Sequence, residues 1–493
     1  MEVLSPIAVL SIGAIFAYLV GRISHSRSLA GFITFLALAG AGHGVYQIQS
    51  RLNEELVPRW PLSGTPMVTA YLRGDALGVF LATVALGLAA LVTIYSMRYM
   101  HKIGIGKFYA LLLLMTTGIV GVGFASDLFS LFVLFEAMSI ASFVLVAFER
   151  DKWEPVEAGM KYLAISTAGS LMALLGISMV YMYTNSLDLA IIPALLIERV
   201  GTPELLAITA LLVVGFGVKA ALVPMHTWLP DAHSAAPTGI SAMLSGIVIQ
   251  AGLIAMVKSL MAVRAFDSGL LLGIIALVTM FVGNLIALRQ TDIKRMLAYS
   301  SVAQMGYIFM GVGLALGFPS LAGFHGMRGA LYHILNHAIM KGGAFLCAGV
   351  LLYLTGTRDL GKLSGIGRRV PLMGWCMLLF ALALAGTPPL NGYLSKLLLC
   401  RAGVEVGGWG VFLVVMLILN SVISLFYYLR AANGILFGAV PDDQKITKSV
   451  PLMMAAPVIV LAALVLFLGL YPEAGFQLVD PAAEYLNKLI TLQ

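Results

Sequence analysis

The sequence predicts an all-α polytopic membrane protein with about fourteen transmembrane helices. Of the 493 residues, 60% are hydrophobic and only 11% are charged, which is about half the charge of an ordinary soluble domain. The mean hydropathy of +0.97 agrees with this class. Apolar runs of about 18 residues or more, each long enough to cross a bilayer, recur along the whole chain.

The apolar runs place the expected helices in chain order. The first six lie near residues 3–21, 28–48, 73–97, 108–125, 128–148 and 157–184. Eight more lie near 204–224, 238–260, 270–289, 294–317, 323–354, 371–402, 408–434 and 450–470. The segment from Gln49 to Tyr71 is too polar to span, so we expect it at the surface, and an amphipathic tail follows Pro472. The first run begins at Val3 without basic residues before it, so we interpret it as a span rather than a cleaved signal.

The basic residues between the spans predict the orientation of the chain, because Lys and Arg concentrate in cytoplasmic loops. Loops after odd-numbered helices, with the adjoining helix ends, hold seventeen basic residues, and the opposite side holds nine. We therefore expect a protein of the inner or plasma membrane with both termini on the outer side. Topology thus explains the net charge of +7. Outside the spans, the sequence contains no cluster of basic and aromatic residues, so we do not expect nucleic acid as a partner.

The three cysteines give no sign of a cofactor. Cys347, Cys376 and Cys400 each lie within or beside an apolar run, and no CxxC spacing occurs. Iron–sulfur, zinc and haem sites use closely spaced ligands of this kind. We therefore expect neither a cofactor nor a metal in this chain.

The stretch from Leu212 to Gly246 combines a buried lysine with an interrupted helix. It begins as an apolar helix, carries Lys219, and is expected to break at Pro224, Pro230 and Pro237. A lysine near a helix centre costs about 2.5–3.5 kcal/mol, so such a residue normally faces a cavity or a partner and marks an ion path. The alternative is a proline-kinked helix whose lysine snorkels to one interface.

The span near 371–402 has the same combination, with an interruption at Thr387-Pro388-Pro389 and Lys396 beyond it. Helices seven and twelve are each the fourth in a run of five, an arrangement typical of transporters with inverted repeats. We therefore expect helices 1–3 in residues 1–107, a first five-helix repeat in 108–265 and a second in 266–436. The last helix and the tail occupy 437–493.

The fifth expected span contains a carboxyl group. Glu136 lies nine residues after Asp127, which corresponds to a depth of roughly 13 Å. A lone carboxyl at that depth stays protonated unless a cation faces it, and Lys219 is the obvious cation. A Glu–Lys attraction that can be made and broken suits a switchable proton carrier. The alternative is a neutral structural glutamate that is hydrogen-bonded to a neighbouring helix.

Histidines accompany both lysine-bearing regions. His333, His337 and Lys341 occur at steps of four in the eleventh span, so they share one helix face and could relay protons with water between them. Two histidines at this spacing can also bind a metal, but no carboxylate or cysteine completes the motif. His226 and His233 flank the break in helix seven, where they either line a water-filled side or cap backbone groups that the prolines leave free.

Four motifs, FEAMSIASF, VKAALVPMHTWLPDAHSAAPT, HILNHAIMKGG and GTPPLNGYLSK, occur in this order. With them, the chain resembles an antiporter-like subunit of the complex I superfamily. That family includes the L-, M- and N-type membrane subunits of NADH:quinone oxidoreductase, the Mrp sodium/proton antiporter subunits and the matching subunits of membrane-bound hydrogenases. The resemblance covers roughly residues 70 to 440. It implies a fold with two inverted five-helix repeats and a role as one ion-pumping module.

The resemblance also assigns residues to roles. Glu136 and Lys219 match the family's glutamate–lysine pair on helices five and seven. Lys396 matches the charged residue of broken helix twelve, where the M type often has glutamate. The stripe of His333, His337 and Lys341 resembles the polar line of helix eleven.

One position departs from the family pattern. Where many members carry a lysine or histidine in helix eight, this chain reads SGIVIQAGL with Gln250. Because glutamine cannot hold a charge, the central relay is expected to pass through water, Ser245 or His233, or to be less active. This departure, with the chain length and the lack of a long C-terminal lateral helix, argues against the L type.

Three functions compete at this point. The first is a proton (or sodium) translocating subunit of a redox-driven complex, without catalytic site or cofactor of its own. Its partners are other membrane subunits, through them a peripheral iron–sulfur redox arm, and the lipid bilayer. The second is a stand-alone secondary transporter, which needs polar groups that converge on one pocket. The third, a membrane-embedded enzyme, needs a nucleophile, a metal cluster or a phosphate cradle, and the sequence contains no sign of these.

Overall fold

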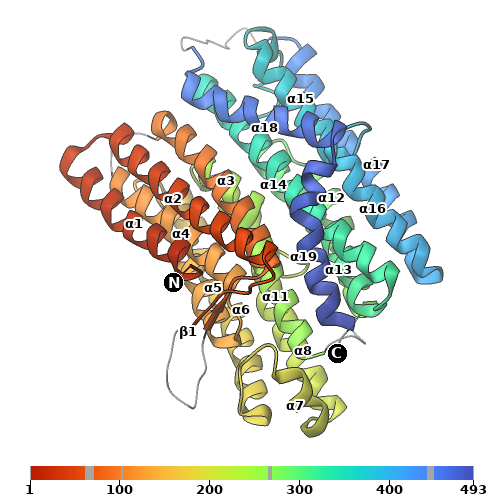
Figure 1. Cartoon of the computed structure of the whole chain (residues 1–493). Helices are drawn as coiled ribbons and strands as arrows, with labels where there is room; N and C mark the ends of the chain where they lie inside the picture. Colours follow the sequence, from red (N-terminus) through yellow and green to blue (C-terminus); the bar gives the residue numbers. More distant parts are fainter. Residues whose placement is uncertain (1, 62–70, 101–103, 265–268, 441–448, 492–493) are drawn as a thin grey trace.

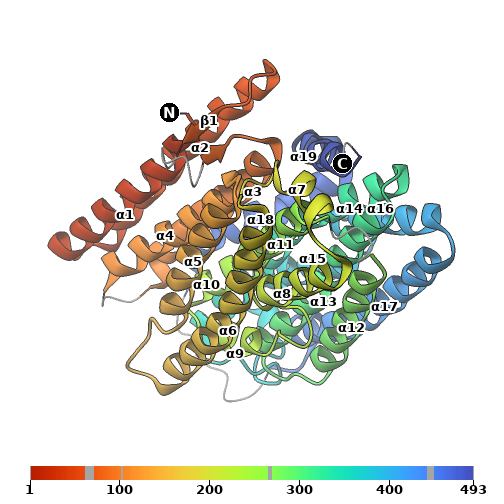
Figure 2. The same cartoon turned by 90° about the horizontal axis from the view of Figure 1, so that it is seen from below.

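The computed structural model describes residues 2–61, 71–100, 104–264, 269–440 and 449–491. Its helices lie side by side in one elongated bundle, with the N-terminal helices at one end and α16 and α17 at the other (Figure 1, Figure 2). Among the described residues, thirteen helices are long and apolar enough to cross a membrane. The predicted fold class, an all-α polytopic membrane protein, is confirmed.

The N-terminal part contains three long helices and a small hairpin. Its elements are α1 (Leu4–Ser24), α2 (Arg27–Asn53), β1 (Arg59–Pro61), β2 (Tyr71–Arg73) and α3 (Ala76–Tyr99). The two strands are antiparallel, with Trp60 opposite Leu72. The hairpin lies within the segment that was expected at the surface, of which residues 62–70 lie outside the described part.

The next part begins with α4 and ends with α11. Its elements are α4 (Ile105–Phe124), α5 (Leu128–Val146), α6 (Trp153–Thr184), α7 (Ile192–Arg199), α8 (Thr202–Lys219), α9 (Trp228–Ala235), α10 (Thr238–Met243), the π-helical turn η1 (Leu244–Val248) and α11 (Ile249–Ala262). The segment α10–η1–α11 forms one span, and its membrane-crossing part is completely buried in the bundle.

The remaining elements follow the same pattern of long helices with one interruption. They are α12 (Gly269–Leu288), α13 (Ile293–Gly317), α14 (Leu321–Thr355), the 3-10 turn η3 (Ile366–Arg368), α15 (Pro371–Ala385), α16 (Asn391–Val406), α17 (Gly408–Phe437), α18 (Leu452–Leu470) and α19 (Glu473–Thr491). The expected twelfth span is the pair α15 and α16, which accounts for the difference between the thirteen long helices and the predicted number. The expected amphipathic tail is α19.

The interruption of helix seven differs in one detail from the prediction. The helix ends at Lys219, and the chain is non-helical up to Trp228 and again around Pro237. Pro230, however, lies in the first turn of α9 and does not break it. The first helical turn tolerates proline because its backbone N–H groups have no partner within the helix.

Aspartates begin three of the spans. The carboxylates of Asp75, Asp127 and Asp292 accept a hydrogen bond from the backbone N–H three residues further on, at 2.7, 2.7 and 3.0 Å. Such N-caps satisfy a donor that the helix itself leaves free. They therefore fix where α3, α5 and α13 begin.

The chain makes the same backbone contact twice. Asp127, before α5, pairs with Asp188 after α6, and Asp292, before α13, pairs with Asp359 after α14. If every span crosses the membrane, the first pair follows the fourth span and the second follows the ninth, so the two lie at opposite membrane faces. Matching contacts at opposite faces support the predicted inverted repeat. The boundaries at 107, 265 and 436 stay predictions, and residue 265 lies outside the described part.

A basic side chain also closes the end of the first helix in each expected repeat. Lys258 of α11 donates to the carbonyls of Val122, Gly123 and Ala125 at the end of α4. Arg430 of α17 donates to the carbonyls of Leu288 and Gln290 at the end of α12, both at 2.8 Å. The last carbonyls of a helix lack intrahelical partners, and a cation there also interacts favourably with the helix dipole.

We predict that Lys258→Met destabilises the protein by about 1–3 kcal/mol, because it leaves buried carbonyl groups without a donor. Lys107→Met is the matched control, since Lys107 is exposed. The measurement is the Tm of the purified complex in detergent. Equal Tm values for the two variants would contradict the capping role.

Candidate functional site

The titratable groups that the sequence singled out lie in the interior of the bundle. Lys219, His233, Gln250, His333, His337, Lys341 and Lys396 are all at most 5% exposed, His226 is 8% exposed, and Glu136 is half-buried. They come from α5, α8, the break after α8, α9, α11, α14 and α16. Both broken helices therefore contribute a buried lysine.

Lys219 and Glu136 have neutral partners in this structure. The Lys219 ammonium donates to the Tyr162 hydroxyl at 2.5 Å, and the Glu136 carboxylate accepts from the Ser170 hydroxyl at 2.5 Å. In the described part of the chain, Lys219 Nζ and the Glu136 carboxylate oxygens are further apart than 4.0 Å, the limit of an ion pair. They still interact electrostatically. The expected pair is thus in a separated state.

An aromatic cluster surrounds Lys219. Its Nζ lies 4.4 Å from the ring centre of Tyr162, 5.9 Å from that of Trp228 and 6.0 Å from that of Phe135. Aromatic faces attract cations, more strongly where water is excluded. On the other side, α11 passes so closely that a Cβ at Gly252 would lie 2.9 Å from Lys219 Cβ. Lys219 is therefore held between α6, the break and α11.

The carbonyl groups at the break are satisfied mainly by side chains other than the two histidines. Lys294 Nζ donates to the carbonyls of Ser234 (3.3 Å) and Ala236 (2.6 Å), and Arg358 also donates to Ser234. His226 interacts with the carbonyl of Pro224. His233 stacks on Phe345 at 4.9 Å and interacts with the backbone of Ser241. Each histidine thus interacts with a backbone group near the break, and the capping interpretation fits both.

The centre of the bundle connects helix eight with helix eleven. Gln250 Nε2 lies 2.6 Å from His337 Nδ1, and both side chains are fully buried. The turn η1, a π-helical distortion just before Gln250, accompanies this contact, and such turns are frequent at functional sites. Gln250 Oε1 and His337 Nε2 have no partner among the described residues. The glutamine therefore joins helix eight to helix eleven through a buried polar contact.

His333 continues the polar line into the second broken helix. Its two ring nitrogens lie 2.8 Å from Ser395 of α16 and 2.8 Å from Gln304 of α13. Gln304 in turn donates to the carbonyl of Leu384, which also accepts from Lys396 Nζ at 3.2 Å. The rings of His333 and His337 are 6.3 Å apart.

Lys396 and Lys341 occupy different surroundings. Lys396 donates to the carbonyls of Leu384 and Ala385, which end α15, and to Ser421 at 3.0 Å. Lys341 donates to the carbonyl of Leu297 at 2.8 Å and to Ser300, both on α13. His333, rather than Lys341, is thus the member of the helix-eleven stripe that is connected to Lys396.

Sequence reasoning missed three buried groups. Lys258 and Lys294 were counted among the loop charges, but they are only 7% and 2% exposed and close helix ends. The apolar residues on both sides of Lys258, in IAMVKSLMA, could have indicated burial. Tyr162 was overlooked, although Tyr162, Ser166 and Ser170 recur at steps of four in an apolar span.

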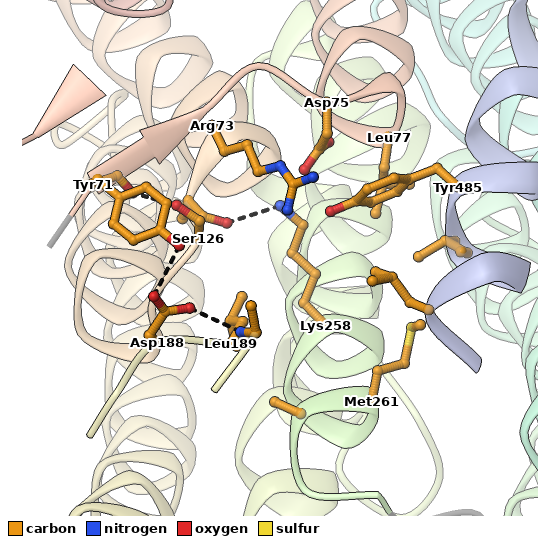
Figure 3. Close-up of a pocket in the computed structure, with 15 residues that line it drawn as sticks. Tyr71, Arg73, Asp75, Leu77, Ser126, Asp188, Leu189, Lys258, Met261 and Tyr485 are labelled. Atoms are coloured by element: carbon orange, nitrogen blue, oxygen red, sulfur yellow. Dashed lines mark hydrogen bonds between the residues drawn. The ribbon is translucent and has the colours of Figure 1, made fainter. Parts of the chain in front are cut away.

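A small cavity of about 50 Å³, which charged, polar and apolar side chains line together, adjoins Lys258 (Figure 3). Arg73, Asp75, Asp188 and Tyr485 also point toward it. Its wall includes the hydrogen bond from the Tyr71 hydroxyl to Asp188, at 2.9 Å. Burial, and then this hydrogen bond, raise the pKa of Tyr71. The cavity joins the hairpin, α11 and α19, and it has room for only a few water molecules.

No group of three or more potential metal ligands occurs among the described residues. Buried titratable groups that lie on several helices and are joined by neutral hydrogen-bonding side chains are typical of ion-translocating membrane proteins. The fold alone indicates only a polytopic membrane protein. The lysine at each helix break narrows this to the ion-translocating class.

The chain belongs to the NADH:quinone oxidoreductase/Mrp antiporter transmembrane family, whose sequence profile matches residues 125–424. It is 37% identical to F(420)H(2) dehydrogenase subunit N of Methanosarcina mazei over 83% of this chain and 84% of that protein. It is 32% identical to NADH-quinone oxidoreductase subunit N of Desulforudis audaxviator over 92% of each chain. A chain of the Mrp complex from Dietzia sp. DQ12-45-1b has the same fold, with a TM-score of 0.86, 22% identity and 99% of both chains covered. The predicted resemblance is thus confirmed.

We predict that Gln250→Leu slows ion pumping about fivefold, because it removes one buried hydrogen bond worth about 1 kcal/mol. Gln250→Lys should keep near-normal pumping, since an ammonium can still donate to His337. Ion uptake into vesicles that contain the native complex is the measurement. A normal rate for Gln250→Leu would show that the route does not pass through helix eight.

Proposed function

We propose that this chain is a proton (or sodium) translocating, antiporter-like subunit of a redox-driven multisubunit membrane complex. The observation that carries the proposal is the buried polar line between the two broken helices, in which hydrogen bonds join Gln250 to His337 and His333 to the surroundings of Lys396. The family membership and the relatives' names, dehydrogenase and quinone oxidoreductase subunits, support the same role.

We propose an order of transfer along this line. Glu136 and Lys219 act as the switch of the first half, and the contact of Gln250 with His337 links the two halves. His333 and Gln304 then lead to Lys396, which is the outward gate. Lys341 and His233 lie beside this route, and His226 supports the break in helix seven.

A stand-alone secondary transporter is the second candidate, and the structure favours it less. The buried titratable groups are spread over several helices instead of converging on one pocket. The cavity beside Lys258 has a volume of about 50 Å³, which is too small for an organic solute. Copurification separates the two candidates, since a subunit comes with redox partners and a transporter comes alone.

The relatives are subunits of multisubunit complexes, so this chain has membrane partner subunits. We further propose that these partners connect it to a peripheral iron–sulfur arm. With the basic loops inside, both termini lie on the outer side of the plasma membrane. The partners carry out the redox chemistry, and this subunit translocates the ion with its own side chains.

We predict that Lys219→Ala and Glu136→Ala each abolish most pumping and leave assembly nearly intact, because the pair switches rather than supports the fold. Pumping is measured in proteoliposomes with the native complex, with NADH and F420H2 tried as electron donors. Wild-type pumping in either variant, at equal complex content, would remove the pair from the mechanism.

We predict that Lys396→Met stops pumping, because it removes the last titratable group on the proposed route. Methionine retains most of the side-chain volume, so the packing around this position should change little. Lys396→Glu should be the mildest replacement, since it retains a group that can bind and release a proton. The measurement is the number of ions pumped per electron. Equal ratios for the two variants would count against Lys396 as the outward gate.

A further inference from the structure

Both members of the Glu136–Lys219 pair are bound by the same neighbouring helix. Tyr162 accepts the hydrogen bond of Lys219, and Ser170 donates to Glu136, each at 2.5 Å. Both partners belong to α6, which packs between α5 and α8. The two charges are thus separated by contacts to a third helix.

The partners form a polar stripe on α6, which consists of Tyr162, Ser166 and Ser170. These residues recur at steps of four, so they share one face of the helix. Tyr162 is fully buried, and the two serines are 5% and 6% exposed. Eight residues separate Tyr162 from Ser170, which corresponds to roughly 12 Å along the helix. The stripe therefore provides two docking points that are two turns apart.

The Tyr162 docking point is rigid. Its ring stacks on Trp228 with a centroid distance of 3.9 Å and an interplanar angle of 4°, and Phe143 packs against it edge-on at 5.7 Å. Trp228 is fixed in turn by the hydrogen bond from its indole N–H to the carbonyl of Val218 at 2.8 Å. The Tyr162 hydroxyl consequently cannot follow the flexible Lys219 side chain when that side chain moves.

We propose that the α6 polar stripe is a positioning element of ion translocation, in which Tyr162 docks Lys219 and Ser170 docks Glu136 in the separated state. This inference rests on the proposed function. An ammonium and a carboxylate attract each other strongly in a low-dielectric interior. The two docking hydrogen bonds, each assisted by a charge, offset that attraction. The separated and paired states thereby come close enough in free energy for a neighbouring event to switch them.

The first test removes only the docking hydroxyl. Tyr162→Phe retains the ring and its stacking on Trp228, but Lys219 loses its hydrogen-bond acceptor. The loss of a charge-assisted hydrogen bond shifts the balance toward the paired state by about tenfold or more. We expect ion pumping by the native complex in proteoliposomes to fall about tenfold. Tyr181→Phe, on the exposed side of the same helix, is the matched control and should pump normally.

A second variant distinguishes positioning from mere support of the fold. Glu136→Asp withdraws the carboxylate by one methylene and weakens its attraction for Lys219. The double variant Tyr162→Phe/Glu136→Asp should therefore pump faster than Tyr162→Phe alone at equal complex content. A structural role for Tyr162 predicts that the two losses add. Additive losses, or normal pumping by Tyr162→Phe, would overturn the proposal.

The Ser170 docking point has its own matched pair. Ser170→Thr keeps the hydroxyl and should pump at more than half the wild-type rate, whereas Ser170→Ala should pump several times more slowly. Ser178→Ala is the control, because the Ser178 hydroxyl donates to the carbonyl of Leu174 within its own helix. Equal rates for the Thr and Ala variants would overturn the role of Ser170.

The outcome for Lys219→Ala, measured in parallel, separates this inference from the proposed function. If Lys219→Ala still pumps, the Glu136–Lys219 pair has no part in the proposed order of transfer, and the inference fails with it. If Lys219→Ala is inactive and Tyr162→Phe pumps normally, only the α6 polar stripe is rejected.

Discussion

A positive charge buried in a bilayer must be stabilised, and in this protein neutral oxygen atoms do most of that work. Lys258, Lys294 and Lys396 each donate to carbonyl groups at the C-terminal end of a helix, and Lys219 donates to a tyrosine hydroxyl. A direct ion pair in this environment would be hard to break. Neutral acceptors stabilise the ammonium less strongly, so the charge remains free to change partners.

The broken helices follow from the same constraint. A helix that ends inside the bundle exposes carbonyl groups that need donors, since irregular backbone at membrane depth must be satisfied by protein or water. The end of α15 thereby provides the acceptors for Lys396, and the end of α9 those for Lys294. The prolines, which appear in the sequence as interruptions, thus create binding positions for cations. The site and the fold depend on the same missing backbone hydrogen bonds.

The sequence predicted the spans well because apolar length is a strong signal, and it placed the breaks because proline and lysine coincide there. It also singled out Glu136, Lys219, His333 and Lys396 as candidates, since isolated polar residues stand out in apolar helices. What it could not predict are contacts between helices. The pairing of Gln250 with His337, the separation of Lys219 from Glu136, and the link from His333 to Lys396 depend on helix packing, which no local pattern encodes. Burial of Lys294 was missed for a related reason, because its neighbours Asp292 and Arg295 resemble a surface turn.

We propose that the Glu136–Lys219 pair alternates between a separated and a paired state during turnover. The most direct measurement is the distance between Lys219 Nζ and the Glu136 carboxylate in cryo-electron microscopy structures of the native complex, at rest and during steady turnover. We expect Lys219 to contact Tyr162 at rest, and a turnover class to bring the two charges within 4.0 Å, the limit of an ion pair. The same separated distance in every class, with pumping intact, would contradict it.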